Sequence, residues 1–240
     1  MPGPADSIVY EQRIMLYADI LGWSDIVRKS ESNPEARQTI SQVVDQLKRE
    51  EYFQNLPGTA CRMAFVSDSI FLSMSPDDPA AWTTSILLLC NHFNTLLDKY
   101  HLHVRGAIVM GPVFHQGSTI VGPGVISAVE SERQTVFPRI VIHDSALEFL
   151  RDAYQEYAEI QWLNRGPDGV ASLNTIDIGF GSNQEGMVDL AGRTIRRVEE
   201  RLLVDGKDPK LVAKHLWMMA YCQDLLQANA GAFGYRGQFW

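Results

Sequence analysis

The sequence predicts an α+β fold in which long helices pack on one face of a mainly antiparallel sheet. Short apolar runs of strand length occur along the chain, and several of them come in adjacent pairs. Longer segments between these runs carry apolar residues at helical spacing. Strand pairs interleaved with helices are typical of α+β sandwiches.

The first part of the chain is expected to form one strand followed by two helices. Segment 13–20, RIMLYADI, is an apolar run of the kind found in buried strands. A helix begins in the GWSD stretch that follows. Segment 34–53 starts with a proline, which is tolerated at the first helical position. Its apolar residues recur at i, i+3, i+4 and i+7, namely at Ile40, Val43, Val44 and Leu47.

The next part is expected to form two strands and a second long helix. The run CRMAFVSDSIFLSM, residues 61–74, reads as two short strands because Ser67 and Asp68 interrupt its apolar residues. Segment 79–100 is a second amphipathic helix, again with a proline at its start.

The second half of the chain adds further strands and helices. A strand covers 103–111 and is expected to end at Gly111–Pro112, and 113–122 continues as a strand or hairpin arm. The other expected elements are a helix over 124–133, a strand over 138–143, a helix over 144–154 capped by Asp144, a turn-rich region over 159–186, and closing helices over 189–203 and 208–227.

Composition narrows the class of protein. The 240 residues include 45% hydrophobic and 21% charged residues, which is typical of a globular chain. We expect a single domain over 1–240, with a core of about 10–180 and C-terminal helices over 187–228. The formal net charge of -8 argues against nucleic acid or an anionic membrane as a partner, since both reward a basic surface.

The sequence also suggests a compartment. No secretory signal precedes the first strand, and no apolar stretch reaches the length of a membrane span. Cys61, Cys90 and Cys222 lack paired or metal-type spacing, which favours reduced thiols in a cytoplasmic protein.

Two acids stand out because apolar residues flank them. Asp19 ends the first strand, and Asp68 lies between the second and third. Taken singly, Asp19 is more simply interpreted as a helix cap and Asp68 as a hairpin turn residue. Taken together, carboxylates on neighbouring strands repel each other unless a cation lies between them. Hard oxygen ligands suit Mg²⁺ or Mn²⁺, so the pair is a candidate metal site.

The turn after Asp19 is a candidate phosphate site. Gly22, Trp23 and Ser24 open a helix, and a helix N-terminus presents unpaired N–H groups to anions. Gly22 lets the backbone approach a ligand closely.

Three segments together resemble one family. YADILGWSDIV, FVSDSIFL and VRGAIVMGPVFHQGSTIVGPGVISAVESE resemble, in the same order, the motifs of class III nucleotidyl cyclases. The resemblance covers roughly Arg13 to Glu132. It is strongest to the stand-alone bacterial pyrimidine cyclases of the Pycsar antiphage system. It implies the class III cyclase fold, with a ferredoxin-like core.

The resemblance implies a set of metal ligands. Asp19 and Asp68 match the family's two metal-binding aspartates, and Ile20 matches the residue whose backbone carbonyl completes one metal shell. Two ions, Mn²⁺ or Mg²⁺, are therefore implied. Trp23 replaces the family's aromatic residue in the phosphate-side turn.

The base pocket departs from the family pattern. Ala64 and Thr119 stand where purine cyclases carry their charged base-reading residues. Arg62 lies two residues before Ala64 on the same strand face and is a candidate donor to the O2 carbonyl of uracil or cytosine. The alternative is that Arg62 is a solvated residue at a strand edge.

The transition-state pair departs as well. The family's Asn and Arg align with Ile126 and Glu130. Either the chain is inactive or another cation replaces the lost arginine. The candidates are Arg105, Arg139, Arg193, Arg196 and Arg197. The last three share one predicted helix face, which is alternatively a solvated face paired with Glu199 and Glu200.

The implied activity is conversion of UTP or CTP to a 3′,5′-cyclic monophosphate and pyrophosphate, with UTP favoured on resemblance alone. The resemblance further implies a homodimer whose active sites lie between subunits, with the Arg105–Glu132 segment facing the other chain's Asp19 and Asp68. The product would act on a separate effector that senses the cyclic nucleotide and stops phage growth. One alternative is a degenerate cyclase homology domain. Another is a different palm-type enzyme, such as a diguanylate cyclase, but the segment VSDSIF lacks the glycines of the diguanylate cyclase hairpin.

One histidine pair also attracts attention. His101 and His103 share a strand face and could hold zinc, but no third ligand is evident nearby. A surface pair is the simpler interpretation.

Overall fold

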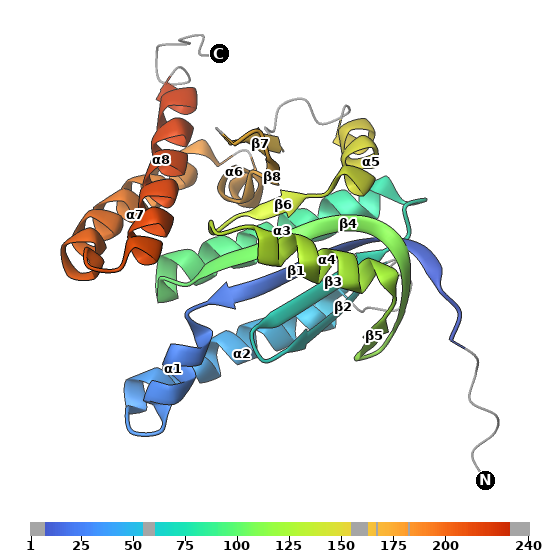
Figure 1. Cartoon of the computed structure of the whole chain (residues 1–240), viewed down its shortest axis with the longest axis horizontal. Coiled ribbons are helices and arrows are strands. Elements are labelled where there is room, and N and C mark those ends of the chain that lie inside the picture. The colour runs from blue at the N-terminus through green and yellow to red at the C-terminus, as the bar shows by residue number, and fades with distance from the viewer. Residues whose placement is uncertain (1–7, 55–60, 155–162, 167, 182, 231–240) are drawn as a thin grey trace.

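The computed structural model describes residues 8–54, 61–154, 163–166, 168–181 and 183–230. The strands within these ranges are β1 (Glu11–Leu21), β2 (Cys61–Val66), β3 (Ser69–Met74), β4 (His103–Gln116), β5 (Thr119–Val121), β6 (Ile140–Ile142), β7 (Leu163–Arg165) and β8 (Ala171–Leu173). The helices are α1 (Trp23–Ser30), α2 (Pro34–Gln54), α3 (Pro79–Tyr100), α4 (Pro123–Gln134), α5 (Asp144–Tyr154), α6 (Thr175–Phe180), α7 (Gln184–Asp205) and α8 (Pro209–Ala230). Figure 1 shows how they are arranged.

The centre of the sheet has ferredoxin-like topology. Strands β2, β3, β1 and β4 are neighbours in that order, and each neighbouring pair is antiparallel. Helices α1 and α2 connect β1 to β2, and α3 connects β3 to β4. This is the β-α-β-β-α-β arrangement. Strands β6, β8 and β7 extend the sheet beyond β4, and the β4–β6 pair is parallel. The predicted α+β class with a mainly antiparallel sheet is therefore confirmed.

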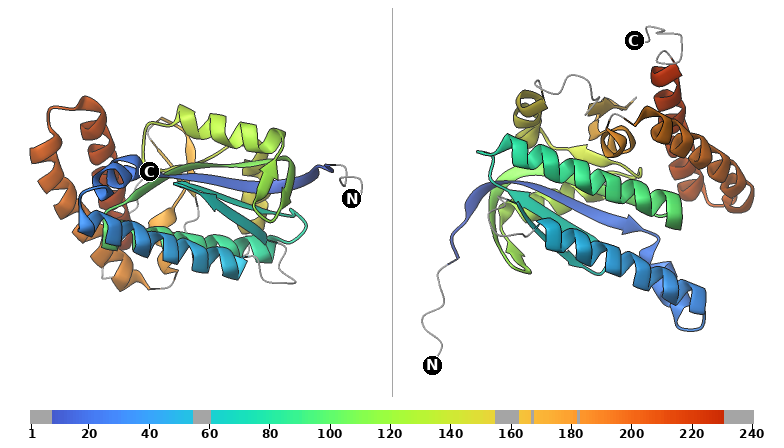
Figure 2. Two further views of the ribbon diagram at one scale, coloured as in Figure 1. Left: turned by 90° about the horizontal axis from the view of Figure 1, so that it is seen from below. Right: turned by 180° about the vertical axis from the view of Figure 1, so that it is seen from behind.

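Helices cover both faces of this sheet. Ile14 and Leu16 of β1 belong to the large core that also contains Trp82 of α3. Met15 and Tyr17 face the other way and pack in a smaller cluster that contains Ala128 of α4. Figure 2 shows the sheet between α4 on one side and α2 and α3 on the other. The expectation of helices on one face is wrong here, because consecutive apolar residues in β1 need apolar cover on both sides.

Strand β4 also differs from its predicted length. It passes through Gly111–Pro112 and ends at Gln116, where it turns back into β5. Proline is tolerated in a strand where the ladder does not need its missing N–H. Strand β6 pairs with β4 only between Gly106 and Ile108, so Pro112 lies beyond the part of β4 that has neighbours on both sides.

The β1–β4 contact depends on a small residue. A Cβ atom at Gly106 would lie 2.2 Å from the carbonyl oxygen of Tyr17, which is closer than real Cβ atoms approach another atom. Glycine at this position therefore lets β4 approach β1 next to Asp19.

The C-terminal half contains more regular structure than its turns suggested. Strands β7 and β8 and the short helix α6 lie within the region expected to be turn-rich. Helices α7 and α8 form an antiparallel pair whose shared cluster includes Leu190, Cys222 and Leu97 of α3. In Figure 1 this pair stands beside the end of the sheet where β1 ends and β4 begins. Among the described helices, none combines the length and the apolar character that crossing a bilayer requires.

Candidate metal and nucleotide site

The ends of two elements bring Asp19 and Asp68 together. Asp19 is the third residue from the end of β1 and lies opposite Ser69, the first residue of β3. Asp68 occupies the two-residue turn between β2 and β3. The backbone N–H of Ile20 donates to the carbonyl oxygen of Asp68 over 3.0 Å, which ties this turn to the end of β1. The two aspartates singled out in the sequence are thus neighbours in one chain.

The surroundings make the charge on Asp19 unfavourable. Burial raises the pKa of Asp19 to about 6, and the nearby carboxylates of Asp68 and Glu132 contribute, while Arg105 opposes the rise. A hydrogen bond between the Asp19 and Asp68 carboxyl groups also favours the protonated form of Asp19. A divalent cation between the two groups would reverse this balance, because it stabilises both as carboxylates.

The donor set fits a hard divalent cation. Carboxylate oxygens are the ligands that Mg²⁺ and Mn²⁺ prefer, and Mg²⁺ is commonly held by one or two carboxylates together with substrate phosphates and water. Within the described part of the chain, no group of three or more His, Cys, Asp or Glu side chains is arranged to hold a metal. Any ion here would therefore take the rest of its ligands from backbone, water or a bound phosphate.

Arg105 is the basic residue directly across from Asp19. The two face each other in the β1–β4 register, and Arg105 Nε donates to Glu132 of α4. Its NH1 group donates to the carbonyl of Thr135 over 3.3 Å. Within one chain, Arg105 therefore lies beside Asp19, because β4 is hydrogen-bonded to β1. That this segment faces the other chain's aspartates stays a prediction.

Tyr17 and Ser69 complete the polar surroundings of Asp19. Tyr17 precedes Asp19 by two residues and so shares its sheet face. Its hydroxyl lies 3.3 Å from Ser69 Oγ, and burial raises the pKa of Tyr17. Sequence reasoning missed both residues and gave Glu132 no role. The two-residue period of β1 would have identified Tyr17, whereas no local signal points to Glu132.

The turn after Asp19 has an open backbone. Gly22 caps α1 with φ of 83°, and a Cβ placed there would meet nothing within 4 Å. The N–H groups of Asp25 and Ile26 donate to the Gly22 carbonyl. Ser24 is exposed. Trp23 is only 4% exposed and packs in the main core, so its indole does not face the turn. Trp23 can therefore offer a phosphate only its backbone N–H.

The base-pocket candidates do not gather at one place. Residues directly opposite each other in antiparallel strands share a face. Ala64 lies opposite Phe71, which lies opposite Tyr17, so Ala64 shares the face of Asp19. The rings of Tyr17 and Phe71 are 5.1 Å apart, and they pack in the cluster that contains Ala128 of α4. Thr119 is exposed on β5, at the far end of β4 from Arg105.

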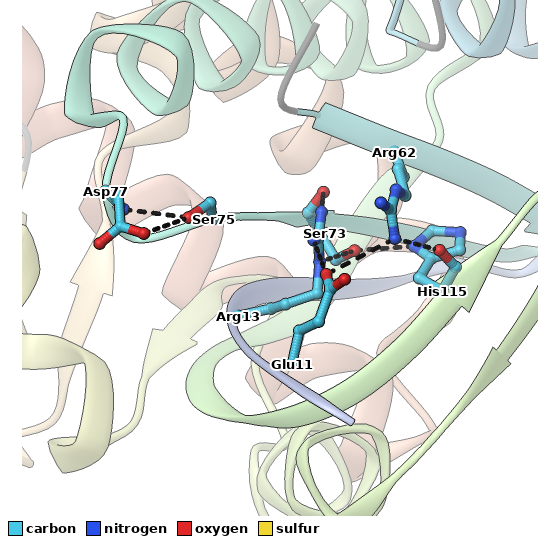
Figure 3. A network of polar contacts seen from close by, with 7 residues as sticks. All are labelled: Glu11, Arg13, Arg62, Ser73, Ser75, Asp77 and His115. Carbon is cyan, nitrogen blue, oxygen red and sulfur yellow. Dashed lines mark hydrogen bonds and ion pairs between the residues drawn. The ribbon is translucent and has the colours of Figure 1, made fainter. Parts of the chain in front are cut away.

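Arg62 shares that face but is held at the other end of the sheet. Its NH1 group donates to the His115 carbonyl over 2.5 Å and lies 3.7 Å from Glu11. Figure 3 shows this arrangement next to Arg13 and Ser73, with the Ser75–Asp77 contact farther along the chain. Arg13 is 4% exposed and donates to Ser73 Oγ over 3.0 Å. Arg62 is therefore neither a free edge residue nor directed at Asp19.

Three of the other candidate cations are paired with carboxylates. Arg139 donates to both carboxylate oxygens of Asp168 and lies over the Phe137 ring. Arg193 contacts Asp98 of α3, and Arg197 lies 3.5 Å from the same carboxylate.

The helix arginines do not share one face of α7, contrary to the prediction from the sequence. Arg196 is exposed, whereas Arg193 and Arg197 turn toward α3. The alternative was that these arginines pair with Glu199 and Glu200. Arg193 and Arg197 instead contact Asp98. Ile126 and Glu130, which replace the family's catalytic Asn and Arg, lie on the exposed side of α4, and Ile126 is 61% exposed.

Comparison with known proteins gives remote structural similarities. No protein-family model matches the chain, and no curated protein matches it. Solved structures similar to it include the adenylyl cyclase CyaB from P. aeruginosa, at 14% identity over 68% of this chain and 92% of that chain, with a TM-score of 0.43. Another is a class III adenylyl cyclase-like ATP-binding protein from Pseudomonas aeruginosa, at 15% identity over 68% of this chain and 38% of that chain, with a TM-score of 0.47. An adenylate/guanylate cyclase/hydrolase from Silicibacter pomeroyi aligns at 13% identity over 68% of this chain and 95% of that chain, with a TM-score of 0.38.

Proposed function

We propose that this protein is a metal-dependent nucleotidyl cyclase that converts UTP or CTP to the 3′,5′-cyclic monophosphate and pyrophosphate. The observation that carries the proposal is the pair of partly buried carboxylates, Asp19 and Asp68, held together at one end of a ferredoxin-like sheet. The motif resemblance over Arg13 to Glu132 supports the same reading.

The chain's own residues would bind and orient the reactants. Asp19, Asp68 and the Ile20 carbonyl would hold two ions, Mn²⁺ or Mg²⁺, which when bound acidify the ribose 3′ hydroxyl and neutralise the leaving pyrophosphate. Backbone N–H groups of the turn from Gly22 to Ser24 would orient the triphosphate. The 3′ oxygen bonds to the α-phosphorus as the bond to the β-phosphate oxygen breaks, and the hydroxyl proton passes to water.

Arg105 is the candidate cation with the best position for the transition state. It lies across from Asp19 in the sheet, whereas Arg139, Arg193 and Arg197 are paired elsewhere. Its charge opposes the rise in the pKa of Asp19, which supports an electrostatic role at this site.

Base selection would involve Ala64, Arg62 and Thr119. Ala64 offers a base no hydrogen-bonding side chain, so Arg62 and Thr119 would supply the polar contacts. Arg62 would need to leave the His115 carbonyl to donate to a pyrimidine O2. The preference for UTP over CTP rests on resemblance alone.

A homodimer would assemble the complete site. Thr119 and Asp19 lie toward opposite ends of their strands within one chain, so one site containing both requires two chains. Ile126 at 61% and Val66 at 62% exposure offer apolar surface on the elements that would meet.

The physiological role in the proposal follows from the resemblance. The cyclic nucleotide would be a cytoplasmic second messenger in antiphage defence, read by a separate effector protein with a cyclic-nucleotide sensor. Neither nucleic acid nor membrane enters this role.

Incubation with Mn²⁺ and each of the four nucleoside triphosphates tests the activity. Mass spectrometry of the products should show cyclic UMP or cyclic CMP and pyrophosphate. Asp68→Asn should abolish the product, while Asp25→Asn, which neutralises an exposed acid on α1, should retain it. Cyclic AMP or cyclic GMP as the main product would refute the pyrimidine assignment.

A second candidate is a degenerate cyclase domain that binds nucleotide or dimerises without turnover. Ile126 and Glu130 in place of the catalytic Asn and Arg favour it. Nucleotide binding in the presence of Mn²⁺, with no cyclic product from any of the four substrates, would establish this candidate instead.

A further inference from the structure

A cavity lies between the α7–α8 pair and the start of β4. Its volume is about 460 Å³, and its lining includes Thr194 and Arg197 of α7, His215 of α8 and His103 of β4. Figure 1 shows the two helices beside this end of the sheet. Sequence analysis treated His103 as a surface residue, whereas the structure places it against this cavity.

The lining residues carry polar atoms that lack partners. Thr194 Oγ1, Arg197 NH1 and His103 Nδ1 are buried and have no hydrogen-bond partner in the described structure. Thr194 is only 2% exposed. Of the five such atoms among the described residues, these three belong to one cavity. Buried polar groups are normally satisfied, and a ligand in this cavity could satisfy these three together.

The cavity lining also carries ionisable groups. Burial lowers the pKa of His103 to about 4, and the electrostatic influence of His215, His101 and Lys214 acts in the same direction. Arg201 also lines the cavity. The lining also carries two acids, Glu200 and Asp205. Asp205 is engaged by His215 Nε2 over 3.0 Å. Unpaired donors beside guanidinium groups are an environment in which an oxyanion can bind.

The donors match a phosphate group. Thr194 and Arg197 are three residues apart on α7 and so project from the same side of the helix. A hydroxyl, a guanidinium and an imidazole can donate to several oxygens of one tetrahedral anion at once. The cavity is larger than a free phosphate, so it also admits a phosphate carried by a nucleotide.

We propose that Thr194, Arg197 and His103 form a binding site for a phosphate-bearing anion, separate from the Asp19–Asp68 site. The site joins the α7–α8 pair to β4 two residues before Arg105, which faces Asp19. Its ligand would therefore tie the C-terminal helices to the strand that carries Arg105.

Equilibrium binding of inorganic phosphate, pyrophosphate and UMP tests the proposal. Calorimetry is done with EDTA present and with ionic strength held constant, so that neither metal nor screening contributes. Wild type should bind at least one of these anions saturably. Arg197→Gln should weaken binding about tenfold or more, since it removes a charge-assisted donor. Arg196→Gln makes the same charge change on the exposed side of α7 and should leave binding within about twofold.

The arms of the experiment also identify the source of the phosphate. Equal affinity for phosphate and UMP indicates a free-anion site, and tighter binding of UMP indicates a nucleotide site. Asp68→Asn should bind the anion as wild type does, whether or not the protein is a cyclase. Loss of binding in Asp68→Asn, equal weakening in the Arg196 and Arg197 variants, or no saturable binding would each overturn the proposal.

A spectroscopic readout covers the case in which Arg197→Gln does not fold. In wild type, the imidazole resonances of His103 should move on phosphate addition, while those of His92, buried in α3, should stay fixed. Unchanged His103 resonances under saturating anion would also refute the site.

Discussion

The N–H of Ile20 donates to the carbonyl oxygen of Asp68 at 3.0 Å, so a backbone hydrogen bond holds the two aspartates together in addition to the contact between their carboxyl groups. The antiparallel pairing of Asp19 with Ser69 reinforces this placement. Neutral replacements of either carboxylate keep these backbone bonds. Variants at Asp19 and Asp68 should therefore fold, and their effects should report on charge.

Asp19→Asn should make the metal-free protein more stable at pH 7.5. The folded pKa of Asp19, about 6, exceeds its ordinary value of 3.8, so the charged form is less favourable in the folded state than in the unfolded one. The stability this group contributes is present at low pH and is lost as pH rises through 6. Removing the charge should add on the order of 1–2 kcal/mol to the unfolding free energy at pH 7.5. Denaturant unfolding in EDTA measures it, and a less stable variant would contradict the prediction.

Mn²⁺ should raise the melting temperature of wild type but not of Asp19→Asn or Asp68→Asn. A ligand that binds only the folded state stabilises it according to its concentration and affinity. Asp25→Asn keeps both candidate ligands and should respond as wild type does. Equal stabilisation of all four proteins by Mn²⁺ would show that the ion binds elsewhere.

The turn that carries Asp68 is strained at its first residue. Ser67 adopts φ of 59°, a left-handed conformation that is unfavourable for any residue with a Cβ atom. Ser67→Gly should therefore increase stability by about 0.5–1 kcal/mol, and the β-branched Ser67→Val should decrease it by about 1–2 kcal/mol. Thermal unfolding of the two variants compares them, and the reverse order of stability would show that the turn relaxes in solution.

Much of this arrangement could be predicted from local pattern. The polar Ser67–Asp68 break in an apolar run indicates a hairpin, and Asp19 at a strand end then falls beside it in a βαββαβ order. The Arg105–Glu132 and Arg139–Asp168 pairs could not be predicted, because they join residues 27 and 29 positions apart through tertiary packing. The burial of the Trp23 side chain could not be predicted, because an aromatic residue after a turn can face either the ligand or the core. The α7–α8 cavity has no motif, because its lining comes from four separate segments.

Acid should destabilise the protein between pH 6.5 and 4. The pKa values of His92, His103 and His115 are each lowered to about 4, mainly by burial, from an ordinary value of 6.5. In that range the unfolded chain binds protons that the folded chain does not, so the unfolding free energy falls as pH falls. Each histidine contributes up to about 3 kcal/mol, and Asp19 offsets part of this between about pH 4 and 6.

His92→Leu should flatten this acid dependence. It removes a buried imidazole whose Nε2 has no partner in the described structure, and it roughly conserves side-chain volume. His143→Gln, at an exposed position, should leave the dependence unchanged. Unfolding free energies at pH 7 and pH 5 measure the slope, and identical slopes for wild type and His92→Leu would contradict this assignment.

Arg105 should be needed for stability as well as for activity. The Glu132 side chain is only 4% exposed, and removing Arg105 would leave its charge buried without its ion-pair partner. Arg105→Gln should therefore lower the unfolding free energy by about 3 kcal/mol. Arg133→Gln, an exposed change next to Glu132 on α4, should lower it by less than about 0.5 kcal/mol. Because Arg105 also opposes the rise in the pKa of Asp19, that pKa should increase further in Arg105→Gln. The double variant Arg105→Gln/Glu132→Gln removes both charges and should recover much of the stability without recovering cyclase turnover. Recovery of turnover in the double variant would show that Arg105 acts only by neutralising Glu132 and has no direct part at the Asp19 site.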